Sequence, residues 1–198
     1  MLLTVFSVAL LLAPCVSKNV PRPGFAAQLP QQCPGVKYGA YTITLSLFTL
    51  TNELRWRIAS GQNLKDMQNQ GGPMYGVRWS CILEANATTL LGAGETSLPH
   101  YVVLSFNSTK GSSRAAKIKD VFGQMKADPL GHSTLSSPNV TYFGCAYSYS
   151  NPTLRVLCVF SSESNEGSSG HSSCSSDSDC TLIQGSTCSD KLCWAPSV

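Results

Sequence analysis

The sequence has few charged residues, which make up only 13% of its 198 positions. Its 14 basic and 11 acidic side chains are scattered along the chain and leave a formal net charge of only +3. A nucleic-acid-binding protein needs a dense basic surface, so the composition excludes that class of partner. Hydrophobic residues reach 42% and aromatic residues 9%, which is enough for a packed core and excludes a chain that is disordered throughout.

The sequence also lacks the local motifs of common catalytic sites. It has no G-x-S-x-G nucleophile elbow, no phosphate-binding loop and no pair of carboxylates at an informative spacing. Only three histidines could act as a general base: His100, His132 and His171. We expect His171 to be solvated in a serine-rich stretch, and His100 is best interpreted as a loop residue before a strand. The sequence therefore predicts a protein that is not an enzyme and that holds no cofactor.

The only long apolar run is at the N-terminus. Residues 1–12 (MLLTVFSVALLL) have the length of a signal-peptide core and are too short to span a bilayer. The small residues Cys15 and Ser17 suit cleavage just before Lys18, and no later stretch reaches transmembrane length. We therefore expect a signal peptide over residues 1–17 and a secreted, extracellular mature protein.

Nine cysteines in a chain of this length point to an oxidising compartment. Loss of Cys15 with the signal peptide leaves eight, an even number, as a closed set of disulfides requires. The eight are Cys33, Cys81, Cys145, Cys158, Cys174, Cys180, Cys188 and Cys193. We expect all of them to form structural disulfides.

The last four cysteines are separated by five, seven and four residues. A zinc site needs close ligand pairs such as Cys-x2-Cys, so this spacing favours disulfides over metal. Three pairings are open within the tail, and we favour Cys174–Cys188 with Cys180–Cys193. Cys145 and Cys158 lie on the two arms of a predicted hairpin and should pair, which leaves Cys33 to pair with Cys81.

Three helices are predicted from the spacing of apolar residues. The first runs from Tyr41 to a cap near Gly61, and the second from about residue 78 to residue 91, with Trp79, Leu83 and Leu90 on one stripe and Ile82 beside it. The third begins after a cap at Ser112 or Ser113 and ends before Pro129.

Strands are predicted at residues 101–106, 140–149 and 153–160, the last two joined as a hairpin through Ser150-Asn151-Pro152. Residues 18–39 are predicted as an irregular arm, and residues 61–75 and 126–139 as long loops. The mixed α+β domain therefore covers residues 18–160. A serine-rich linker at residues 161–173 and a cysteine-rich tail at residues 174–198 follow it.

Four groups of residues occur in the order and spacing of one known family. They are TNELR with ASG at residues 51–61, MYGVRWSCILE at 74–84, FGCA with VLC at 143–158, and the tail cysteines with the residues between them from 174 to 188. These groups resemble the opening helix, second helix, hairpin and C-terminal end of the CAP superfamily, also called SCP/TAPS. That superfamily comprises cysteine-rich secretory, antigen 5 and pathogenesis-related-1 proteins. The tail is similar to nematode Ancylostoma-secreted, or venom-allergen-like, members. The resemblance implies a three-layer α-β-α sandwich.

The resemblance also implies a cavity with two histidines and two glutamates, which binds a divalent metal in some members. Gly131-His132-Ser133-Thr134 resembles the family's GH-x-TQ, which makes His132 the candidate for a retained cavity histidine. Gln124 stands at the position of one of the family's two glutamates. Leu98-Pro99-His100 stands at the position of the other. The second histidine of the family's cavity has no counterpart in this sequence. Glu95 could be a displaced carboxylate, although a solvated loop acid explains it better. One imidazole cannot hold zinc alone, so we expect no metal.

Three sequons could accept N-linked glycans, at Asn86, Asn107 and Asn139. Asn107 follows a predicted strand and is the best acceptor, and Asn139 lies in a predicted loop. Asn86 falls on the apolar stripe of the second predicted helix, where a glycan would compete with packing.

These features together predict a secreted, non-catalytic CAP-family protein of a parasitic nematode. The resemblance suggests that it binds a host cell-surface receptor or plasma protein and modulates immune or haemostatic cells, with the two long loops carrying recognition. The alternative is a lipid or sterol carrier, on the strength of the apolar residues 101–106 and 154–160. A residual metal-dependent enzyme is a third hypothesis.

Overall fold

The computed structural model of the chain describes residues 23–35, 38–62, 73–161 and 172–196. Its elements are α1 Pro23–Ala26, α2 Tyr38–Ala59, β1 Arg78–Trp79, α3 Cys81–Ala93, β2 Tyr101–Ser108, α4 Arg114–Ala127, α5 Pro129–Ser136, β3 Tyr142–Ser150, β4 Thr153–Ser161, the 3-10 turn η1 Asp177–Asp179, β5 Thr187–Ser189 and β6 Leu192–Trp194. The expected signal peptide, most of the predicted loop at 61–75 and most of the predicted linker, including His171, lie outside the described residues.

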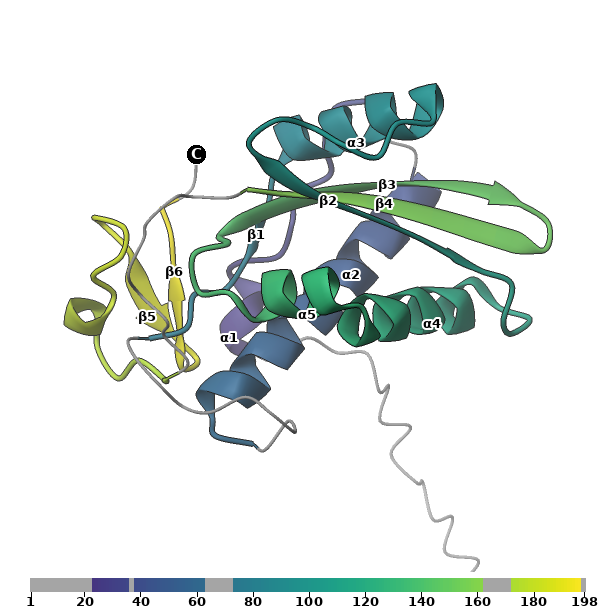
Figure 1. The fold of residues 1–198 in the computed structure, drawn as a ribbon. Coiled ribbons are helices and arrows are strands. Elements are labelled where there is room, and N and C mark those ends of the chain that lie inside the picture. Colours follow the sequence, from purple (N-terminus) through teal and green to yellow (C-terminus); the bar gives the residue numbers. More distant parts are fainter. Residues whose placement is uncertain (1–22, 36–37, 63–72, 162–171, 197–198) are drawn as a thin grey trace, which may run out of the picture.

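The centre of the fold is a four-stranded sheet in the order β1-β3-β4-β2. β3 pairs antiparallel with β4, and β4 with β2, whereas β1 lies parallel to the start of β3. Helix α3 covers one face of the sheet, and α2, α4 and α5 cover the other (Figure 1). The α+β class and the three-layer α-β-α sandwich expected from the resemblance are therefore confirmed.

Helix α2 carries two buried polar side chains that bind the chain just before β1. Asn52 accepts a hydrogen bond from the backbone N–H of Val77 at 2.8 Å and donates to the carbonyl of Val77 at 3.0 Å. Arg55, fully buried, donates to the carbonyls of Tyr75 at 2.7 Å and of Val140 at 2.8 Å. These bonds hold the residues before β1 against α2 and link α2 to the residues that precede β3.

The second predicted helix begins later than expected. Arg78 and Trp79 form the short strand β1, because the backbone N–H of Arg78 donates to the carbonyl of Thr141. Ser80 is then the N-cap of α3, and its side chain accepts a hydrogen bond from the N–H of Leu83. Trp79 is therefore not part of the helical stripe, and Ile82, which was expected beside that stripe, is 71% exposed.

Two segments predicted to be irregular contain helix. Most of the expected loop at residues 126–139 is α5, which starts at Pro129 behind an Asp128 N-cap whose carboxylate accepts from the N–H of Gly131 at 2.8 Å. The N-terminal arm contains the one-turn helix α1, and its Phe25 is fully buried in the main core.

Four disulfides connect the described parts of the chain. They pair Cys33 with Cys81, Cys145 with Cys158, Cys174 with Cys188, and Cys180 with Cys193. These are the pairs favoured from the sequence. Among the described residues, no helix is both long enough and apolar enough to cross a bilayer.

The cysteine-rich tail is joined to the main core by Trp194. Its ring is fully buried, with its centroid 5.8 Å from that of Phe25 and 6.4 Å from that of Phe48. A Cβ atom built on Gly76 would lie 2.6 Å from this ring, so glycine is required where the backbone passes it. The backbone of Cys193 exchanges hydrogen bonds with Met74 and Gly76, which extends the contact into the segment before β1.

We expect the substitution Trp194→Ala to destabilise the whole domain, because it removes the largest fully buried side chain and leaves a cavity in the core. The expected loss in the free energy of unfolding is about 3–5 kcal/mol, measured by chemical denaturation with the disulfides intact. Leu130→Ala is the matched control, since Leu130 is 53% exposed and its loss should cost less than about 0.5 kcal/mol. Equal stability of the two variants would show that the tail is dispensable for the core.

Candidate functional site

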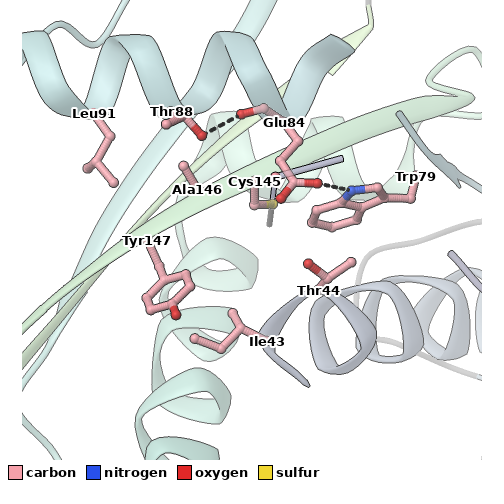
Figure 2. A pocket seen from close by; sticks show the side chains of 10 residues that line it. Ile43, Thr44, Trp79, Glu84, Thr88, Leu91, Cys145, Ala146 and Tyr147 are labelled. Atoms are coloured by element: carbon pink, nitrogen blue, oxygen red, sulfur yellow. Dashed lines mark hydrogen bonds between the residues drawn. The ribbon is translucent and has the colours of Figure 1, made fainter. Parts of the chain in front are cut away.

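A pocket of about 350 Å³ lies at one edge of the central sheet, between α3 and α2 (Figure 2). It is lined by residues from five segments of the chain: Gly35, Ile43, Thr44, Trp79, Glu84, Thr88, Leu91, Cys145, Ala146 and Tyr147. α3 forms one wall, α2 the opposite wall and β3 the floor between them. Volumes of this order are typical of small-ligand or side-chain binding sites.

The position of Glu84 depends on a close approach between α3 and β3. A Cβ atom built on Gly144 would lie only 2.2 Å from the backbone nitrogen of Glu84, so any larger residue would push α3 away from the sheet. Because Gly144 allows this contact and Ser80 starts the helix one turn earlier, Glu84 projects from α3 toward the strand edge. The local sequence thus fixes a carboxyl group at the pocket wall.

Glu84 is the only carboxyl among the described residues that line the pocket, and it is buried, with 8% of the residue exposed. Its Oε2 accepts a hydrogen bond from the indole Nε1 of Trp79 at 2.7 Å. No lysine, arginine or histidine is among these lining residues. Burial raises the pKa of Glu84 above its ordinary value of 4.5, and the bond from Trp79 partly offsets that rise.

The floor of the pocket is an edge of β3 that, beyond Phe143, no strand in the described part of the chain covers. β1 pairs with β3 only at Tyr142 and Phe143, and the carbonyl of Phe143 faces outward, since it accepts from the N–H of Ser80. Backbone groups alternate in direction along an antiparallel strand, so the N–H and C=O of Cys145 and Tyr147 also face away from β4. No hydrogen bond joins these groups to any part of the chain that the structure describes.

The residues expected from the family cavity are not brought together as a metal site. His132 is half-buried in α5, whereas His100 and Glu95 are exposed, His100 in a turn with φ of 66°. The amide of Gln124 is already engaged, donating to a carboxylate oxygen of Asp120 at 2.8 Å and to a backbone carbonyl at 2.9 Å.

Within the described ranges, the one group of three potential ligands close enough to share a metal ion is Cys174, Cys180 and Cys193. All three of these cysteines are in disulfides, which removes them as thiolate ligands. The candidate ligands that the structure describes therefore do not fit a divalent metal of the kind that the resemblance implies.

The three sequons lie in different surroundings. Asn107 is exposed near the end of β2, whereas Asn86 on α3 and Asn139 just before β3 are half-buried. The exposure of Asn107 is consistent with its choice as the best glycan acceptor. Its glycosylation stays a prediction.

Sequence reasoning did not find the pocket. From the sequence, Trp79 is expected on the apolar stripe of a helix, Glu84 enters only through the family resemblance, and Tyr147 only as part of a strand. A signal was present in the spacing of a tryptophan and a glutamate five residues apart around an N-cap serine. That spacing places an indole N–H near a carboxylate only when the helix starts at the serine.

Several solved structures share this fold. The chain matches the Ancylostoma-secreted protein Ac-ASP-7 with a TM-score of 0.70 and 26% identity, over 84% of this chain and 96% of that one. A manganese-bound form of Ac-ASP-7 matches with a TM-score of 0.71 and 26% identity, over 86% and 98% of the two chains. Na-ASP-1 matches with a TM-score of 0.64 and 20% identity, over 84% of this chain and 49% of Na-ASP-1. No protein-family profile and no curated protein matches the sequence.

The raised pKa of Glu84 predicts a pH-dependent effect of Glu84→Gln on stability. When the folded pKa lies above the unfolded one, the group favours folding at low pH and loses that contribution as pH rises through the folded pKa. Gln stays neutral and can still accept from Trp79. We therefore expect Glu84→Gln to have a higher melting temperature than the wild type at about pH 8 and a similar one at about pH 4.

The exposed Glu95 provides the control, because Glu95→Gln should shift the melting temperature equally little at both pH values. A variant Glu84→Gln that is less stable than the wild type at the higher pH would mean that the fold stabilises the charged carboxylate instead.

We expect Asn107 to carry an N-linked glycan when the protein is made in a eukaryotic secretory system, because its side chain is exposed. Intact mass spectrometry of Asn107→Gln should show the loss of one glycan mass, and Asn86→Gln should leave the mass of the attached glycans unchanged. A full glycan complement on Asn107→Gln would contradict the assignment.

Proposed function

We propose, on the strength of its fold and its similarity to Ac-ASP-7, that the chain is a CAP-superfamily protein of the nematode Ancylostoma-secreted, venom-allergen-like kind and acts as a secreted, non-catalytic binding protein. Its partner in this proposal is a host cell-surface receptor or plasma protein of the immune or haemostatic system. The signal-peptide pattern of residues 1–17 and the four disulfides support an extracellular site of action.

The observation that carries the proposal is the pocket at the open edge of β3. It combines a concave surface, a buried carboxyl at Glu84 and aromatic side chains at Trp79 and Tyr147. The elements around it are held by the Cys33–Cys81 and Cys145–Cys158 disulfides. A polar group in a largely apolar hollow on a rigid scaffold is a common arrangement for specific recognition.

The groups in this pocket favour binding over catalysis. General acid–base chemistry requires a second titratable group near the first, and nucleophilic chemistry requires a base beside the nucleophile. Among the described lining residues, Glu84 is the one carboxyl and no histidine accompanies it. The two pocket threonines, Thr44 and Thr88, have no general base beside them other than Glu84, whose Oε2 accepts from Trp79.

The observations that motivated a lipid or sterol carrier have a structural explanation. The apolar residues at 101–106 and 154–160 are parts of β2 and β4. Leu104, Val156 and Phe160 from these strands are buried in the main core, and Leu157 and Val159 pack under α3. A packed sheet therefore accounts for both segments.

The test of the proposal is binding of the labelled, glycosylated protein to host leukocytes and platelets, measured by flow cytometry. We expect a saturable signal that excess unlabelled protein removes. Protein reduced and alkylated at its cysteines is the control, since it keeps the composition and charge of the chain without the folded surface, and it should neither bind nor compete.

A flat signal that unlabelled protein does not reduce, with no capture of plasma proteins, would overturn the host-binding proposal. In that case native mass spectrometry of the secreted protein would decide the lipid-carrier alternative through the presence or absence of a bound lipid.

A further inference from the structure

Beyond Phe143, the edge of β3 that faces the pocket has backbone groups without a partner in the described chain, and a second strand could use them. The outward N–H and C=O groups of Cys145 and Tyr147 lie on the floor of the pocket, beyond the two residues where β1 covers the edge. Backbone polar groups at a sheet edge pair readily with an incoming extended chain. Peptide recognition by strand addition uses this kind of edge, with adjacent hollows that receive alternate side chains.

The hollow beside this edge is suited to a positively charged side chain. Oε1 of Glu84 has no hydrogen-bond partner in the described part of the chain, and no basic residue lines the pocket there. A carboxyl whose ionised form is disfavoured by burial gains most from a cation placed beside it. Charge complementarity therefore favours an ammonium or guanidinium group at this position.

The other pocket walls are consistent with the rest of a long basic side chain. Ile43 and Leu91 offer apolar surface to a methylene stem, as lysine and arginine side chains use elsewhere. The rings of Trp79 and Tyr147 also line the pocket, and aromatic side chains can attract a cation (Figure 2).

We propose that the partner contributes an extended segment that adds as a strand along residues 145–149 of β3 and inserts one lysine or arginine side chain into the pocket against Glu84. This inference rests on the proposed binding function and names the chemistry of its partner. A free amine would use only the carboxyl, whereas an extended peptide uses both the carboxyl and the backbone groups of the edge. The edge therefore favours the peptide as occupant.

The probe is a capped pentapeptide, Thr-Val-Lys-Val-Thr, which has strong strand propensity and one central lysine. Two further peptides replace the lysine by norleucine or by glutamate. Binding is measured by isothermal titration calorimetry at neutral pH. We expect the lysine peptide to bind, and both replacements to weaken binding by at least about tenfold, because they leave a buried carboxyl unpaired or add a like charge.

The charge of the pocket is tested on the protein side with Glu84→Gln, which keeps the size of the side chain and its bond from Trp79. We expect this variant to bind the lysine peptide at least about tenfold more weakly than the wild type. Glu95→Gln is the matched control, since it removes one exposed carboxyl outside the pocket and should bind like the wild type. Equal affinity of Glu84→Gln and the wild type would overturn the role of the pocket.

Strand addition is tested with N-methylated versions of the lysine peptide. In an added strand, the N–H groups of every second residue face β3 and those of the other residues face away from it. Methylation of the amides that face β3 should therefore abolish binding, and methylation of the other amides should leave binding unchanged. Amide hydrogen exchange should slow at Cys145 and Tyr147 in the complex. Equal binding by both methylated peptides, or binding of butylamine as tight as that of the peptide, would overturn strand addition in favour of a simple amine site.

Cell binding by Glu84→Gln separates this inference from the proposed function. If the wild type binds host cells saturably and the variant binds equally well, the host-binding function stands and the pocket inference fails. If the wild type binds no host cell or plasma protein, the host-binding function fails, and the peptide measurements alone decide the inference. No binding of the lysine peptide at millimolar concentration would overturn it in every case.

Discussion

The buried guanidinium of Arg55, which is bound by no carboxylate in the described part of the chain, organises this domain. The guanidinium of Arg55 lies inside the core, and its described partners are the backbone carbonyls of Tyr75, Val140 and Thr134. Burial lowers the pKa of Arg55 to about 9, so the group still carries its charge at neutral pH and must be solvated by those carbonyls. These carbonyls come from the segment before β1 and from the stretch between the end of α5 and β3. Burying the cation therefore requires both segments to adopt their native positions. Asn52 reinforces the first of these contacts through Val77. The strand β1, the start of α3 and therefore Glu84 follow from this arrangement.

Most of the fold could be predicted because its main elements have clear periodicity. The apolar spacing of α2 and α4 and the hairpin of β3 and β4 are visible in the sequence, and the cysteine spacing limits the crosslinks. The errors occur where a polar residue near an element's start changes its boundary. Ser80 starts α3 one residue after Trp79, so an apolar pattern that includes the tryptophan predicts too long a helix. Asp128 followed by Pro129 starts α5, but glycine, serines and a threonine within that short helix resemble a loop.

The candidate site could not be predicted in the same way, because it depends on which parts of the sheet stay uncovered. Glu84, Ile43 and Tyr147 lie on three different elements, and none has an unusual sequence neighbourhood. The edge of β3 is open only because β1 is two residues long. That length is set by the cap at Ser80 and by the hydrogen bonds that hold the preceding segment. The depth of the pocket depends in turn on Gly144, because its lack of a side chain lets α3 pack closely on β3. This role of a strand glycine cannot be read from the sequence, since it depends on where the helix packs.

The burial of Trp194 also constrains how the domain can be made in the cell. The indole is buried against Phe25 and Phe48, which come from the N-terminal part of the described chain. During synthesis α2 and the strands of the central sheet emerge before residue 194, but the core cannot close until the tail has also emerged. A chain cut before the tail would lack this buried ring and would expose the unfilled cavity to chaperones and proteases. The native core therefore depends on residues from both ends of the described chain, and neither end can be removed without opening it.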